Sequence, residues 1–334
     1  MDYSMEKASY RSAKEMPDKP VRALITGGNG NLGRLVADRL LAQGQHVIKF
    51  DVPGTEPSDF HENETVLSGD IRDSGVLKDI LAEHRPDTIY HLASLLSGSS
   101  EEDLQATWDI NANASFNLLN LAHETGVGTF FFASTVASYG AVEADPMPED
   151  FPQWPENMYG ATKVAVERMG VYFRHKHGLD FRCLRFPLVV SPFAPPGAVS
   201  AFPSHAFKAA SRGEPFRFPV AETTGMSTLF LEDAIDAIVG FCAADRAVLS
   251  RPTYNLHGYY LSAGMVASAA RQRFPGFDCC FDPIETVEHL IASWPDRIDD
   301  QSARRDWGWQ PRFDFEKSAD RICALLREST NSDA

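Results

Sequence analysis

The sequence lacks several features that mark whole classes of protein. It contains no C-x-x-C pair, its five cysteines are odd in number, and its ten histidines show no spacing typical of metal ligands. Thiols without a pairing pattern favour reduced cysteines and a cytoplasmic protein. We therefore expect neither a disulfide framework nor a bound metal.

Positive charge and long apolar runs are also scarce. Lys plus Arg total 31 against 46 Asp plus Glu, which gives a formal net charge of −15. This balance argues against nucleic acid and against an anionic membrane surface as partners. No apolar run approaches the length of a membrane span. Residues 1–20 are too polar for a signal peptide, so we expect a flexible N-terminal arm there.

The glycines, in contrast, form a pattern, G-x-x-G-x-x-G, between a short apolar run and a helical repeat. Gly27 permits a tight turn, Gly30 lets backbone amides approach a phosphate, and Gly33 lets the helix pack close to the strand. The helix N-terminus then offers free N–H groups to a pyrophosphate. A glycine triplet alone also fits an ordinary strand–turn–helix connection. Here the next predicted strand ends at Asp51, whose carboxylate can accept hydrogen bonds from an adenosine ribose, and the motif therefore predicts a dinucleotide site.

The rest of the chain fits this site. Between residues 21 and 190, apolar runs alternate with helical patterns, which predicts an α/β, Rossmann-type doubly wound parallel sheet. Hydrophobic residues make up 43% of the 334, enough for a large core and a second lobe. We expect an NAD-binding Rossmann domain over 21–190. Residues 191–330, which begin with a cluster of prolines, are expected to form mainly a smaller α/β substrate-binding lobe on the C-terminal side.

A pair of residues that could move a proton lies at the start of a predicted helix. Tyr159 and Lys163 are four positions apart and share a face. An ammonium lowers the pKa of a neighbouring phenol, ordinarily ~10, so Tyr159 can take a proton from an alcohol while hydride leaves for a nicotinamide. Thr135, at a strand end, can bond the substrate oxygen. Asn111, in a helix predicted over residues 101–125, can relay protons to Lys163 through water.

Each of these residues also has a plainer explanation. Tyr-x-x-x-Lys occurs by chance in many helices, Thr135 could simply end a strand, and Asn111 could lie on the surface. Their order after the glycine turn favours the catalytic interpretation.

Taken together, these motifs resemble the extended short-chain dehydrogenase/reductases of the NAD-dependent epimerase/dehydratase family. The resemblance spans nearly the whole chain after Pro20. Its segments are Thr26-Gly27-Gly28-Asn29-Gly30-Asn31-Leu32-Gly33, Gly69-Asp70-Ile71-Arg72-Asp73, His91-Leu92-Ala93-Ser94, Asn111, Ser134-Thr135 and Tyr159-Gly160-Ala161-Thr162-Lys163.

The resemblance implies NAD as cofactor and a homodimer formed through the helices that carry Asn111 and Tyr159. It implies a catalytic set of Thr135, Tyr159 and Lys163, supported by Asn111. Asp51 predicts NAD over NADP, because its charge would repel a 2′-phosphate. The expected cofactor-binding residues are Gly27, Asn29, Gly30, Asn31, Leu32, Gly33, Asp51, Asp70, Ile71, Leu92, Ala93, Ser94, Tyr159, Lys163 and Pro187.

Within that family, three segments are similar to the short-chain type of L-threonine 3-dehydrogenase. They are Leu95-Leu96-Ser97, Pro195-Pro196-Gly197 and residues 293–309. This likeness implies that Ser97, Thr135 and Tyr159 contact a small substrate. Residues 198–203 are more apolar than in that group, which predicts that L-threonine is a poor substrate and a bulkier or more apolar relative a better one.

We therefore expect an NAD-dependent enzyme that oxidises a secondary alcohol of a small substrate, a β-hydroxy amino acid or a hydroxy acid. Two alternatives stay open. A nucleotide-sugar epimerase would keep NAD tightly bound and return the hydride to its substrate. A non-catalytic NAD-sensing protein would bind the cofactor without turnover.

Overall fold

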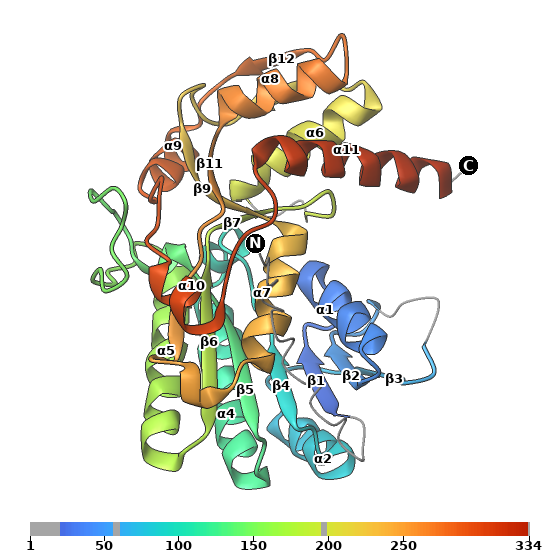
Figure 1. Cartoon of the computed structure of the whole chain (residues 1–334), viewed down its shortest axis with the longest axis vertical. Helices are drawn as coiled ribbons and strands as arrows, with labels where there is room; N and C mark the ends of the chain where they lie inside the picture. Colours follow the sequence, from blue (N-terminus) through green and yellow to red (C-terminus); the bar gives the residue numbers. More distant parts are fainter. Residues whose placement is uncertain (1–20, 56–60, 195–198, 333–334) are drawn as a thin grey trace, which may run out of the picture.

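The computed structural model describes residues 21–55, 61–194 and 199–332. The expected N-terminal arm and the whole Pro195-Pro196-Gly197-Ala198 segment therefore lie outside the described residues. Figure 1 shows a large sheet flanked by helices, with a second group of short strands and helices beyond one end of it.

The large sheet has seven parallel strands in the order β10-β6-β5-β4-β1-β2-β3. β1 lies between β2 and β4, so the strand order reverses at β1, where a dinucleotide binds in folds of this kind. The predicted doubly wound sheet is confirmed. Its strands are β1 (Arg22–Thr26), β2 (His46–Asp51), β3 (Glu64–Ser68), β4 (Thr88–His91), β5 (Thr129–Thr135), β6 (Asp180–Phe186) and β10 (Thr253–Asn255).

Helices cover both faces of this sheet. On one face, side chains such as Leu24, Phe130 and Phe181 pack against α2, α4 and α5. On the other, side chains such as Ile25 and Phe131 pack against α1 and α7. The two sets alternate along the strands, as the pleat requires. These helices are α1 (Asn31–Ala42), α2 (Ser74–His84), α4 (Ala114–Thr125), α5 (Met158–His177) and α7 (Leu231–Ala243).

The helix predicted over residues 101–125 is interrupted. A 3₁₀ turn, η1 (Ser99–Glu101), precedes α3 (Leu104–Trp108), which starts where the Asp103 carboxylate accepts from Ala106 N. A π-helical turn, η2 (Asp109–Asn113), then joins α3 to α4. The π turn holds Asn111, one of the predicted site residues, and π turns inside helices often occur at functional sites.

The remaining elements belong mainly to the second group. Two small sheets have the orders β11-β9-β7 and β12-β8. The sequence analysis predicted a smaller α/β lobe there, but the strands β7, β8, β9 and β11 were not predicted. The elements are β7 (Leu188–Val190), β8 (Phe216–Phe218), β9 (Gly225–Phe230), β11 (Tyr259–Ser262), β12 (Cys279–Phe281), η3 (Val136–Ser138), η4 (Val199–Ala201), η5 (Arg246–Val248), α6 (Phe202–Arg212), α8 (Ala263–Arg273), α9 (Glu285–Ala292), α10 (Gln301–Trp307) and α11 (Phe315–Ser332).

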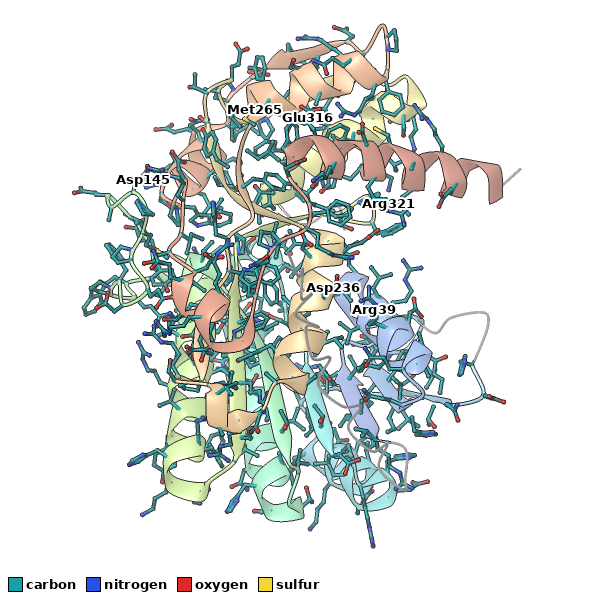
Figure 2. All side chains as sticks on the ribbon, viewed as in Figure 1. Arg39, Asp145, Asp236, Met265, Glu316 and Arg321 are labelled. Carbon is teal, nitrogen blue, oxygen red and sulfur yellow. The ribbon has the colours of Figure 1, made fainter. Side chains whose placement is uncertain are left out.

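The two groups share secondary structure. β10, from the second half of the chain, pairs with β6 at the edge of the large sheet. α7 packs beside α1, where Arg39 and Asp236 form an ion pair and point toward one another in Figure 2. Arg297 also pairs with Asp145 and so ties the loop before α5 to the C-terminal segment. The division at residue 190 stays a proposal about function, since the strand pairing crosses it.

All five cysteines are free thiols. In the part of the chain that the structure describes, no cluster of side chains could hold a metal ion, and no helix has the length and hydropathy of a membrane span.

Candidate active site

The glycine turn leaves no room for side chains. Gly27 has a φ of +71°, and a Cβ atom there would lie 2.8 Å from the backbone nitrogen of Ala93. A Cβ atom on Gly33 would lie 2.0 Å from the carbonyl oxygen of Gly27. Gly30 is the N-cap of α1, and no side chain caps the helix there. The first amides of α1 can therefore reach a phosphate group, as the pattern predicted.

Asp51 ends β2 beside this turn. Its Oδ2 accepts from Asn29 N at 2.8 Å and its Oδ1 from Val52 N at 2.8 Å. A carboxylate has about four lone-pair positions. Two bonds to the backbone orient the group and leave acceptor capacity for ribose hydroxyls. The cation that could attract a 2′-phosphate, Arg34, lies over the ring of Phe193, 5.1 Å from its centroid.

Other predicted cofactor residues surround the same sheet edge. Leu92, Ala93 and Ser94 follow β4, where Leu92 N donates to Thr26 O at 3.0 Å. Asp70 follows β3 and pairs with Arg72, which lowers the pKa of the carboxyl group. The remaining predicted cofactor residues lie on α1, after β3 or after β6. Asn31 and Leu32 are in the first turn of α1, Ile71 is buried in the same core cluster as Phe50, and Pro187 is buried between β6 and β7.

His91 links β1 to the π turn that holds Asn111. The sequence analysis noted this residue only as part of a motif. His91 is buried, and burial lowers its pKa to about 3, so the ring is neutral. Ser115 Oγ donates to the Asn111 carbonyl at 2.6 Å and so accepts from His91 Nε2 at 2.7 Å. His91 Nδ1 then accepts from Thr26 Oγ1 at 2.7 Å. The chain of bonds fixes one tautomer and joins β1 to the π turn.

Asn111 is buried, which excludes the surface explanation. Its Oδ1 accepts from Leu95 N at 2.8 Å, and its Nδ2 donates to Leu95 O at 3.1 Å and to Thr162 Oγ1 at 3.3 Å. The side chain therefore holds the segment that leads to the turn at Ser97. A proton relay from Asn111 through water to Lys163 stays a prediction.

Tyr159 and Lys163 lie in the first turns of α5, whose N-cap Asn157 accepts from Gly160 N at 2.7 Å. Lys163 Nζ donates to the Ala133 carbonyl of β5 at 2.9 Å and lies 5.3 Å from the centroid of the Tyr159 ring. Lys163 is buried and Tyr159 half-buried. The predicted pair thus shares one face, at the end of β5.

The pKa values of this pair differ from the expectation. Burial raises the pKa of Tyr159 to about 12 and lowers that of Lys163 to about 8. Desolvation of the phenolate is the cause of the raised pKa of Tyr159 in the protein alone. A further positive charge beside Tyr159, such as that of an oxidised nicotinamide, would lower this pKa again.

Thr135 is the last residue of β5. Its Oγ1 accepts from Ala137 N at 3.2 Å, and among the described residues none accepts from its hydroxyl. The O–H is therefore available to donate to a substrate oxygen. Ser97, in the turn after Leu95, is half-buried.

These features are those of a nucleotide-binding α/β protein in which Tyr159 and Lys163 lie together at the carboxyl edge of the sheet. A model of the NAD dependent epimerase/dehydratase family matches residues 23–256. The chain belongs to this family, as an NAD-dependent dehydrogenase of the extended short-chain dehydrogenase/reductase type.

Known proteins similar to this chain include enzymes of established name. It is 30% identical over 313 residues to the mitochondrial L-threonine 3-dehydrogenase of Sus scrofa, covering 92% of this chain and 83% of that protein. It is 31% identical over 304 residues to an uncharacterised epimerase/dehydratase of Staphylococcus saprophyticus, covering 88% and 93%. The solved holo form of the GalE-like L-threonine dehydrogenase from Cupriavidus necator matches with a TM-score of 0.84 and 30% identity, over 91% of this chain and 99% of that one.

The glycine turn, the free N-terminus of α1 and the Asp51 carboxylate fit NAD. When bound, NAD accepts the hydride in the reaction of such enzymes.

Proposed function

We propose that this enzyme oxidises the secondary alcohol of a small substrate, a β-hydroxy amino acid or a hydroxy acid, and passes the hydride to NAD. The observation that carries the proposal is the placement of Tyr159, Lys163 and Thr135 around the end of β5. Tyr159 and Lys163 come from α5, and the Lys163 ammonium is bound to the β5 backbone two residues before Thr135.

Each residue has a defined role in this proposal. The Thr135 hydroxyl donates to the substrate oxygen and orients the alcohol. The Tyr159 phenolate removes the hydroxyl proton as the carbon–hydrogen bond breaks. Lys163 supports the phenolate and bonds the nicotinamide ribose. Asn111 holds the Leu95 backbone and thereby places Ser97 beside the substrate.

The substrate proposal draws on the relatives and on the C-terminal segment. Trp294 is buried, and the Pro295 carbonyl accepts from Ser227 N of β9 at 2.9 Å, so the start of residues 293–309 is anchored to the second sheet. One of the apolar residues behind the expectation that L-threonine is a poor substrate lies in the protein core. Phe202, expected to form an apolar wall, is 2% exposed and packs against Phe218. We therefore place L-threonine in the test beside bulkier β-hydroxy acids.

The test is a panel of alcohols assayed for NADH production. L-Threonine, larger β-hydroxy amino acids and β-hydroxy acids are each given with NAD, and Tyr159→Phe is the control. We expect NADH from at least one member with wild type only. Silence across the panel, with interconversion of a nucleotide sugar, would instead establish the epimerase.

We also propose a cytoplasmic homodimer formed through α3, α4 and α5. The supporting observation is a set of large apolar side chains exposed on these helices, which a second copy would cover. Light scattering should give a dimer, and Tyr172→Glu should give monomers. A monomeric wild type would refute the dimer. The residues are Leu104 (53% exposed), Trp108 (39%), Phe116 (45%), Val171 (36%) and Tyr172 (56%).

A further inference from the structure

A buried ion pair that the proposed reaction does not use lies one helical turn from Lys163. Glu167 of α5 is fully buried and Arg185 of β6 nearly so. Arg185 Nη2 lies 2.6 Å from Glu167 Oε2, and Arg185 Nε lies 3.0 and 3.1 Å from the two carboxylate oxygens. A buried pair of this kind adds little net stability, because desolvation offsets the attraction. Its position therefore needs another explanation.

The pair is bonded to the strand that carries Thr135. Ser134 Oγ donates to Glu167 Oε1 at 2.5 Å, and Ser134 directly precedes Thr135. In the sheet, Ser134 is in register with Arg185, and Arg185 with Asn255. In a parallel sheet, residues in register point to the same face. Ser134, Arg185 and Asn255 therefore form a row of polar side chains across three neighbouring strands. This row lies one residue before the edge of the sheet that holds the site.

The same network holds the segment between β5 and α5. Gln153 Nε2 donates to Glu167 Oε2 at 3.2 Å and to Ser138 Oγ of η3 at 2.8 Å. Tyr139 accepts from Arg185 Nη1 at 2.6 Å and donates to Asn255 Oδ1 at 2.7 Å. The end of β5, the segment that follows it and the helix that carries Tyr159 are therefore all bonded to the Glu167–Arg185 pair.

Glu167 also acts on the charge of the catalytic pair. The titratable groups that face Lys163 are Tyr159 and Glu167 on α5, Cys183 on β6 and His91 on β4. Burial raises the pKa of the Cys183 thiol and lowers that of His91, so both are neutral at pH 7. The Glu167 carboxylate raises the pKa of Lys163 against the larger effect of burial.

We propose that Glu167 is a positioning residue, whose carboxylate, held by Arg185 and Ser134, fixes α5 against the end of β5 and places a negative charge one helical turn from Lys163. The inference rests on the proposed function only in taking Tyr159 as the base. The network itself does not depend on the substrate.

The experiment titrates Tyr159 without any substrate. The phenolate absorbance of NAD-saturated protein is followed against pH, and the titration of Tyr159→Phe is subtracted. In Glu167→Gln, the Tyr159 transition should move to lower pH by about half a unit or more, because loss of the anion favours the phenolate. An unchanged or upward transition overturns the proposal. If the enzyme turned over none of the alcohols, the proposed function would be wrong, but the titration of Tyr159 would still test the role of Glu167.

The matched control lies at the other end of β6. Asp180 is buried and pairs with Arg182 and Arg174, as Glu167 pairs with Arg185, but far from the site edge. Asp180→Asn should destabilise the fold and leave the Tyr159 transition where it is. An equal shift in Asp180→Asn would mean that any buried charge has this effect, which would also overturn the proposal.

Two charge-preserving variants test the geometric part, even if Glu167→Gln fails to fold. Glu167→Asp and Ser134→Ala keep the anion and disturb its bonds. Both should keep the Tyr159 transition within the error of the wild type. With an alcohol that the enzyme turns over, both should lower kcat about 10-fold or more with little change in the KM for NAD, because small misplacements of catalytic groups are costly. Normal kcat in both variants would show that the network is structural only.

Discussion

The candidate site has one end at β1 and β2 and another at β5 and α5, and the two ends are built in opposite ways. At β1 and β2, the cofactor side depends on missing side chains, since Gly27 and Gly33 leave space that a single Cβ atom would fill. At β5 and α5, the chemical side depends on charged side chains held in burial, namely Lys163 and the Glu167–Arg185 pair. Cofactor binding should therefore respond to volume, and catalysis to charge and protonation. The comparison would fail if added volume at the glycine turn changed catalysis alone, or if a change of charge at β5 and α5 changed cofactor binding alone.

The largest effect is expected from volume on the cofactor side. Gly33→Ala puts a Cβ atom 2.0 Å from Gly27 O, so the turn must open and NAD binding should be lost in calorimetric titration. Gly240→Ala is the matched control, because a Cβ atom on this helical glycine of α7 would meet nothing within 4 Å. It should bind NAD normally and gain about 0.5–1 kcal/mol of stability. Normal NAD affinity in Gly33→Ala would contradict the steric account.

Next comes loss of the proton acceptor on the chemical side. Tyr159→Phe keeps the ring and its packing, so NAD affinity should stay normal while kcat falls by ~10²–10⁴. Steady-state kinetics and NAD titration on the same preparation check both halves. Near-normal turnover would remove Tyr159 from the mechanism.

The third prediction concerns the charge of Lys163. Lys163→Met should weaken both NAD binding and turnover, yet stabilise the protein at pH 7. The folded pKa of about 8 lies below the ordinary value, so the buried ammonium costs stability below pH 8, and this cost disappears as pH rises above the unfolded value. The gain should be at most about 3 kcal/mol near neutrality and vanish above pH ~10.5. Denaturant unfolding across pH tests it, and a destabilised variant at pH 7 would contradict it.

The smallest effect is expected at Asp51. Asp51→Asn keeps an acceptor for Asn29 N but removes the charge that opposes a 2′-phosphate. The ratio of kcat/KM for NAD to that for NADP should fall roughly tenfold, equivalent to about 1.4 kcal/mol. A wild type that uses NADP as well as NAD would show that Asp51 does not set the preference.

The same comparison explains how much the sequence alone could predict. The glycine turn, the strand–helix alternation and the doubly wound parallel sheet follow from local patterns, and the structure bears them out. The seventh strand, β10, was not predicted in this sheet, because its partner β6 lies about 70 residues earlier in the chain. The Glu167–Arg185 pair joins residues 18 positions apart on a helix and a strand, and no local pattern signals it. His91 lay within a recognised motif, but its bonds to Thr26 and Ser115 depend on the packing of β1, β4 and α4.

Other differences have local physical causes. The interruption of the predicted helix at η2 reflects the bonds that Asn111 makes to Leu95, which a helical pattern does not encode. The raised pKa of Tyr159 follows from burial, which the spacing of Tyr159 and Lys163 does not report. The strands β7, β9 and β11 gain their partners from distant parts of the chain, and β7 and β11 are also short.

The most direct test of the central claim follows the hydrogen atom itself. An alcohol from the panel is prepared with deuterium on its carbinol carbon, and a single turnover with NAD is analysed by mass spectrometry. The account predicts that deuterium appears in the NADH that is released, with wild type and not with Tyr159→Phe. Deuterium that stays on the substrate carbon, or returns to it with NAD still bound, would contradict the account.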